Sequence, residues 1–168
     1  MVGVLLVLGI IGAVFGSDKN SGSNHTLSAP AQSGSYTKQT GALADRVASS
    51  AGTSLQGKFS QNDVRVGVYA PSGSADAEFV FLGVQSSKLS EKSPEETISS
   101  FMVGAKVPNP NTVDPGPLGG KMKCGASSDG EVTCVWVDHN TLGALVFVTL
   151  KGSTAEDLAR TFRSDAEK

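Results

Sequence analysis

The chain has 168 residues and a formal net charge of −2, and 39% of its residues are hydrophobic, 18% charged and 6% aromatic. This length favours one domain. The near-neutral charge excludes a strongly basic nucleic-acid-binding surface and an acidic solvating tail. Two cysteines are too few for a four-cysteine zinc site or a disulfide-dense miniprotein. We therefore expect no metal, no cofactor and no nucleic-acid partner.

The first sixteen residues, MVGVLLVLGIIGAVFG, are apolar throughout. As a helix they would be about 24 Å long, a little shorter than a bilayer core of about 30 Å, and local thinning of the bilayer allows such a helix to span. We expect residues 1–16 to form a transmembrane signal-anchor helix. A cleaved signal peptide is the alternative, although no basic residue precedes the apolar run. One hypothesis for the absent basic run is that Met1 is not the natural start and that an upstream basic stretch completes the signal-anchor.

Residues 17–35 are rich in Gly and Ser and contain a single large apolar residue, Leu27. Such a segment buries too little apolar surface to offset its ordering entropy. We expect a flexible linker here, followed by an extracytoplasmic domain over residues 36–168. His25 lies in this linker, and the sequence assigns it no role.

Capping and apolar periodicity predict three helices in the domain. One covers about residues 40–51, with Leu43 and Val47 on its apolar face. A second begins with Ser93 as N-cap, and Glu96 completes a capping box. A third begins at Ser153, where the same pattern recurs.

The most informative stretch is a predicted hairpin closed by the two cysteines. If Cys124 and Cys134 face each other, the loop has three residues and ends at Gly130, where this hairpin class needs a left-handed residue. The same register places Met122 opposite Trp136. Disulfide and turn chemistry therefore agree, and in an exported protein a structural disulfide is the expected state.

A second tight turn follows the hairpin. A two-residue loop would pair Asp138 with Thr141 and set Trp136 opposite Gly143.

Further strands are predicted over residues 64–69, 78–84 and 142–150 by alternating or continuous apolar runs, and residues 108–120 are expected to form a proline-rich loop. The order is α-β-β-α-β-β-β-α after the N-terminal apolar helix. This order predicts an α+β fold with a mostly antiparallel five-stranded sheet and packed helices.

Candidate functional residues lie around the second turn. Asp138, His139 and Thr141 favour either a catalytic or metal-binding turn, or a polar turn bonded to its own backbone. We expect no catalytic residue, because no G-x-S-x-G elbow is present. Lys121 and Lys123 either contact an anionic surface or form a solvated strand edge. The candidate binding or turn residues are Trp136, Asp138, His139, Thr141, Lys121 and Lys123.

The series Cys124, Cys134, Trp136, Asp138-His139, Thr141 and Gly143 resembles uncharacterised actinobacterial single-pass membrane proteins. The resemblance implies one transmembrane helix and a small extracytoplasmic domain, and it implies no activity. In that family a Pro-rich segment and a basic run precede the helix, and this sequence lacks both.

These observations predict a membrane-tethered extracytoplasmic binding or interaction module in the cell membrane, without catalysis. Its partner would be an unknown cell-envelope component or protein. The alternatives are a hydrolase-type enzyme that uses the Asp138-His139 turn, and a structural or assembly protein of the cell envelope.

Overall fold

The computed structural model describes residues 24–55 and 58–168. The predicted apolar helix over residues 1–16 and residues 17–23 of the predicted linker lie outside the described residues. Within the described ranges, no helix combines the length and the hydropathy needed to span a bilayer.

The domain is built on one antiparallel sheet of eight strands in the order β1-β2-β3-β4-β8-β7-β6-β5. The strands are β1 (Gln32–Ser33), β2 (Tyr36–Lys38), β3 (Val64–Pro71), β4 (Phe79–Gln85), β5 (Asn111–Val113), β6 (Lys121–Ala126), β7 (Val132–Val137) and β8 (Thr141–Phe147). The predicted five-stranded sheet is therefore wrong. The extra strands β1, β2 and β5 have only two or three residues each, too few to show an alternating pattern.

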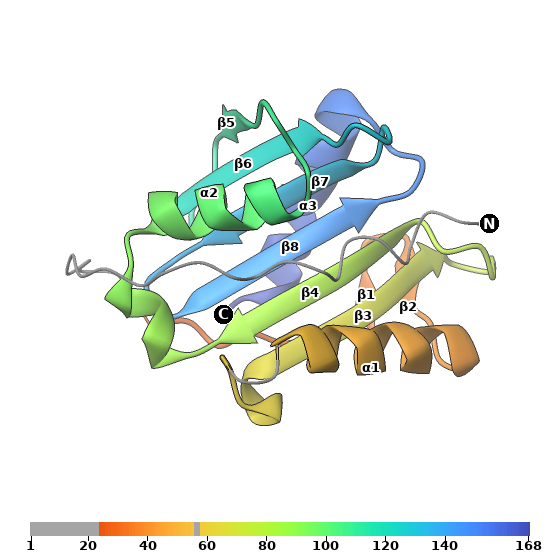
Figure 1. The fold of residues 1–168 in the computed structure, drawn as a ribbon. Coiled ribbons are helices and arrows are strands. Elements are labelled where there is room, and N and C mark those ends of the chain that lie inside the picture. The colour runs from red at the N-terminus through yellow and green to blue at the C-terminus, as the bar shows by residue number, and fades with distance from the viewer. Residues whose placement is uncertain (1–23, 56–57) are drawn as a thin grey trace.

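Helices cover both faces of this sheet (Figure 1). Helices α1 (Ala42–Leu55) and α2 (Pro94–Gly104) lie on one face, and α3 (Gly152–Ala166) lies on the other. Successive strand residues point to opposite faces. Val135 therefore joins the core beneath α1 and α2, while its neighbour Trp136 joins the core beneath α3. Both side chains are fully buried.

The predicted hairpin is confirmed in its register and its turn. Cys124 pairs with Cys134 and Met122 with Trp136 across β6 and β7. Gly130 has a φ of +83°, the left-handed conformation that the loop requires. The two cysteines form a disulfide, so the bond locks a register that the turn also favours.

The second turn is confirmed as well. The backbone N–H of Asp138 donates to the Thr141 carbonyl at 2.9 Å, and Trp136 lies opposite Gly143. A side chain at Gly143 would overlap the indole ring. Gly143 is therefore required by the close approach of Trp136.

Residues 24–35, which we call the strap, are packed against the domain and are not the predicted flexible linker. Leu27 is 3% exposed and forms a bridge with Glu167 after α3. Further along, the Tyr69 hydroxyl donates to the Pro30 carbonyl at 2.7 Å, and burial raises the pKa of Tyr69. Backbone pairing and one well-buried leucine thus offset the ordering cost of a polar segment.

Of the two capping boxes predicted at helix starts, one is confirmed and the other is wrong. At α2 the Ser93–Glu96 capping box forms as predicted, with Pro94 in the first turn. At α3 the capping box predicted at Ser153 does not form. That helix begins at Gly152, and its N-cap, Lys151, makes no side-chain cap bond.

We expect the α2 cap to weaken in acid. Hydrogen bonds from the Ser93 hydroxyl and backbone N–H lower the pKa of Glu96 below its ordinary value of 4.5. A lowered folded-state pKa means that the ionised carboxylate stabilises the fold above pH 4.5, and that this contribution is lost as the pH falls through the folded-state pKa. Glu96→Gln keeps an acceptor for the cap but does not titrate.

Thermal melting at neutral pH and at pH values below the Glu96 pKa checks this expectation. The variant should lose less stability than the wild type on acidification. Glu91→Gln changes an exposed acid outside the capping box and is the control. An equal acid response in the wild type and in Glu96→Gln would contradict the prediction.

Candidate functional site

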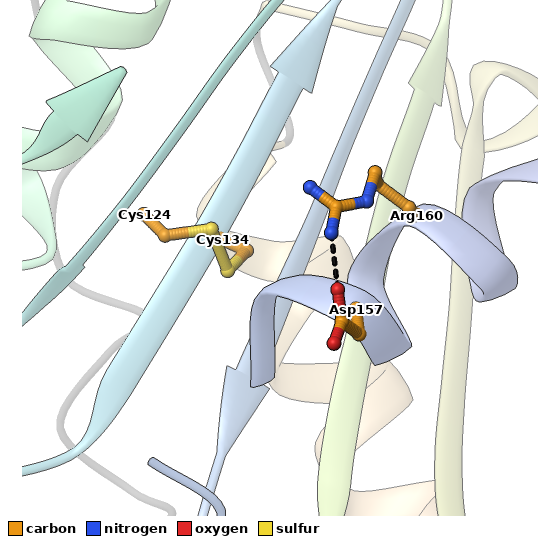
Figure 2. Close-up of a disulfide and its surroundings, with 4 residues drawn as sticks. All are labelled: Cys124, Cys134, Asp157 and Arg160. Atoms are coloured by element: carbon orange, nitrogen blue, oxygen red, sulfur yellow. Dashed lines mark hydrogen bonds and ion pairs between the residues drawn. A yellow bond between two sulfur atoms is a disulfide. The ribbon is translucent and has the colours of Figure 1, made fainter. Parts of the chain in front are cut away.

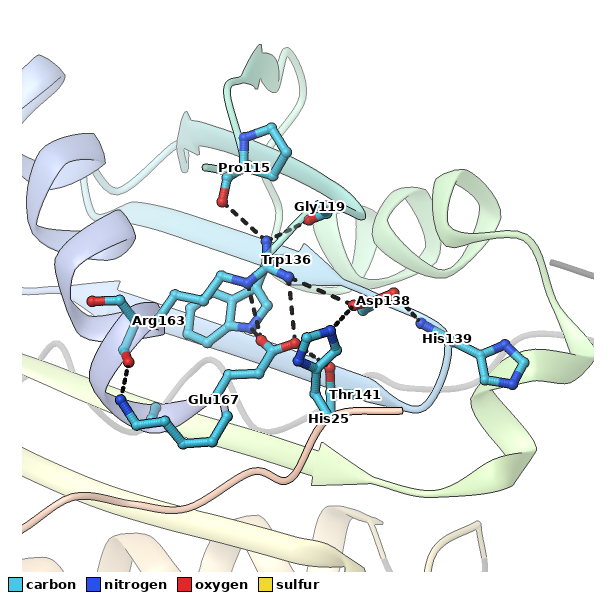
Figure 3. Close-up of polar contacts among 12 residues, drawn as sticks. His25, Pro115, Gly119, Trp136, Asp138, His139, Thr141, Arg163 and Glu167 are labelled. Carbon is cyan, nitrogen blue, oxygen red and sulfur yellow. Dashed lines mark hydrogen bonds and ion pairs between the residues drawn. The ribbon is translucent and has the colours of Figure 1, made fainter. Parts of the chain in front are cut away.

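The strap, β7, β8 and α3 together enclose a buried polar cluster at one end of the sheet (Figure 3). Arg163 and Glu167 at the end of α3 are each 1% exposed, although both carry charge. Buried charges are stable only when they are paired and hydrogen-bonded. The cluster consists of His25, Trp136, Asp138, Thr141, Arg163 and Glu167.

Glu167 is the centre of this cluster and accepts four hydrogen bonds. Its Oε2 accepts from Trp136 Nε1 at 2.8 Å and from Arg163 Nε at 2.9 Å. Its Oε1 accepts from Thr141 Oγ1 at 2.9 Å and from Arg163 Nη2 at 3.3 Å. Charge-assisted bonds of this kind are the strong ones. The carboxylate is thus held in place by two strands and its own helix.

Arg163 connects the cluster to the loop between β5 and β6. Its Nη1 donates to the carbonyls of Pro115 at 3.1 Å and Gly119 at 2.7 Å. Its Nη2 lies 4.0 Å from Asp138 Oδ2. One guanidinium therefore faces two carboxylates and also ties down part of the predicted proline-rich loop.

The strap reaches the cluster through His25. His25 Nε2 lies 3.1 Å from Asp138 Oδ2. The backbone N–H of His25 donates to Asn140 Oδ1 at 3.0 Å, and Asn140 Nδ2 donates back to the His25 carbonyl at 2.9 Å. This role of His25 is not apparent from the sequence. No local pattern links a histidine in a polar segment to a turn so far along the chain.

His139 lies beside this cluster but its ring points away from it (Figure 3). Only its backbone N–H contacts Asp138, donating to Oδ1 at 2.6 Å. The ring Nδ1 is buried and makes no hydrogen bond within the described part of the chain. The histidine that faces Asp138 is His25, so the predicted turn does not bring the Asp138 and His139 side chains together.

Three members of the cluster form a set that a metal ion could use. One ligand atom each from His25, Asp138 and Glu167 lies within 4.8 Å of the others, and histidine with carboxylates is a donor set that suits zinc. Arg163 already supplies a positive charge beside both carboxylates. A cation would be repelled by this guanidinium and would have to displace the donors on Glu167. The residues present thus fit an internal ion-pair network better than a metal centre.

The other predicted site residues are divided between structural and solvent-facing positions. Lys123 forms an ion pair with Glu95 of α2, while Lys121 is exposed. Thr112 of β5 pairs with Lys123, so Lys123 does not lie on a sheet edge, whereas the described β5–β6 register ends at Met122 and does not cover Lys121. The expected solvated strand edge is therefore wrong for Lys123. The outermost strands of the described sheet are β1 and β5.

The disulfide lies in the core beneath α3, which also contains Trp136 of the polar cluster. Cys124 is 3% exposed and Cys134 is fully buried. Figure 2 shows the bond between β6 and β7, with the surface ion pair of Asp157 and Arg160 on the neighbouring helix. The disulfide is therefore a cross-strand bond shielded from solvent.

Comparison with protein-family models, curated proteins and solved structures finds no match for the chain. The resemblance to actinobacterial single-pass membrane proteins therefore stays a prediction. No residue role is transferred from a relative.

Proposed function

We propose that this chain is a membrane-tethered, extracytoplasmic binding or interaction domain without catalytic activity. The observation that carries the proposal is the buried Cys124–Cys134 disulfide. Structural disulfides of this kind persist in oxidising compartments and are rare in the cytosol. The apolar sequence of residues 1–16 supplies the tether, and an envelope component or another protein would be the partner.

The polar cluster supports a non-catalytic role. A catalytic carboxylate or base needs a free atom directed at its substrate. Glu167 is buried and engages both carboxylate oxygens with donors of the domain itself. The hydrolase alternative centred on Asp138 and His139 is less well supported, because their side chains do not meet.

Cell fractionation tests the proposed location. The full chain, produced in a bacterial host, should be recovered with the membranes and should be digested when protease is added to intact spheroplasts. A version that starts at residue 17 is the matched control, and it should leave the membrane fraction. Full chain found in the soluble cytosol, with both thiols free, would overturn the proposal.

Removal of the disulfide should lower the free energy of unfolding. A bond that closes this short loop stabilises by about 2–3 kcal/mol, mainly by restricting the unfolded chain. Cys124→Ala combined with Cys134→Ala should lose that amount in urea unfolding. A reductant should destabilise the wild type and leave the double variant unchanged. Equal unfolding midpoints for the two proteins without reductant would contradict the prediction.

A further inference from the structure

The strap fixes the point at which the chain enters the domain. Thr26 exchanges two backbone hydrogen bonds with Lys168, at 2.7 and 3.0 Å. The Leu27 N–H donates to Gln85 Oε1 at 2.8 Å, and His25 is held by Asn140 and Asp138. Asn24 therefore leaves the domain where β4 ends, β8 begins and α3 ends. We call this end of the sheet the strap pole.

The opposite end, which we call the far pole, carries the connections β3–β4 and β6–β7. The central strand β8 runs from the strap pole to the far pole and has seven residues. At about 3.4 Å per residue the two poles are about 24 Å apart. The strap itself runs along the α3 face, from His25 at the strap pole to β1 and β2, which pair beside the far end of β3.

Packing of the strap shortens the tether. Residues 17–23, seven residues by number, are left between the apolar segment and Asn24, and seven residues span at most about 25 Å when fully extended. This length barely equals the distance between the poles. For the far pole to reach the membrane, the tether would have to be almost fully extended, which is entropically unfavourable.

We propose that the strap pole faces the lipid headgroups and that the far pole points away from the membrane, toward partners. This inference rests on the proposed membrane tether. It assigns the β7–β8 turn and the neighbouring 3-10 helix η4 (Ser87–Glu91) to the membrane-facing surface. The β6–β7 turn is assigned to the outward surface.

Two exposed serines make matched reporters of this orientation. Ser87 lies at the strap pole, because its neighbour Ser86 donates to the Asn140 carbonyl at 2.9 Å. Ser128 lies at the far pole in the β6–β7 turn, and both serines are exposed. The native cysteines are joined in a buried disulfide. Ser87→Cys or Ser128→Cys therefore introduces a single reactive thiol.

The experiment places the full chain in lipid vesicles with a fluorophore on one introduced cysteine and a quencher on the lipid headgroups. The label of Ser87→Cys should be quenched several-fold more than the label of Ser128→Cys. Equal quenching, or the reverse order, in vesicle-bound protein would overturn the orientation. Failure of the protein to float with the vesicles would instead overturn the proposed tether on which this inference rests.

A tether variant separates distance from specific lipid contact. A long Gly-Ser insertion between residues 23 and 24 leaves the described domain unchanged and removes the length limit. The difference in quenching between the two reporters should then largely disappear. A difference that persists with the long tether would show that a contact holds the pole to the lipid, and the length argument would be wrong.

Discussion

Arg163→Met should lower the free energy of unfolding by about 3–5 kcal/mol, because it leaves two carboxylates buried without their cation. Glu167 would lose two of its four donors. Asp138 would lose the guanidinium that lies 4.0 Å away. The carbonyls of Pro115 and Gly119 would lose their donor as well. Urea unfolding of both proteins at neutral pH measures the loss.

Arg160→Met is the matched control on the same helix. Arg160 pairs with Asp157 at the surface, and exposed pairs contribute between about 0 and 1 kcal/mol. Adding Glu167→Leu to Arg163→Met removes one of the uncompensated charges and should recover part of the stability. If Arg163→Met cost no more than Arg160→Met, the cluster would not be the internal ion-pair network described above.

Gly143→Ala should destabilise the domain by about 3 kcal/mol, at the upper end of what overpacking of a core costs. The added methyl group would overlap Cζ2 and Cε2 of the Trp136 ring. This ring has little room to move, because it is fully buried, stacks on Phe81 and donates to Glu167. Urea unfolding and near-UV circular dichroism report stability and indole packing together.

A double variant tests whether the indole is the cause. Trp136→Leu alone should be destabilising, because it removes a large buried ring and the donor to Glu167. Combined with Gly143→Ala, it should cost clearly less than the sum of the two single changes, because the overlap is gone. Strict additivity would show that the glycine is needed for another reason.

Local turn chemistry made the centre of the fold predictable. Gly130 and the two cysteines specify one register for β6 and β7, and both features agree with the structure. The pairing of Trp136 with Gly143 follows from the next turn in the same way. The pairing register of two strands is well specified wherever a shift by one residue would turn buried side chains toward solvent. The continuous apolar runs of β4 and β8 likewise marked two central strands.

The edges of the sheet were not predictable by the same reasoning. Strands β1, β2 and β5 are short, and main-chain pairing joins β1 to β2, β2 to β3 and β5 to β6. Pro and Gly around β5 predicted a loop, although short edge strands are often found in such a context. Their pairing depends on a neighbouring strand and not on a pattern within their own two or three residues.

The polar cluster shows the same limit for function. Trp136, Asp138 and Thr141 stood out in the sequence, but their partners His25, Arg163 and Glu167 did not. Periodicity and capping describe contacts within a few residues along the chain, and they were enough for the disulfide hairpin, the second turn and the α2 cap. The strap and the buried charges bring the N-terminal part of the described chain against its C-terminal part. Such contacts become favourable only when folding has removed water from around them, so only the tertiary structure reveals them.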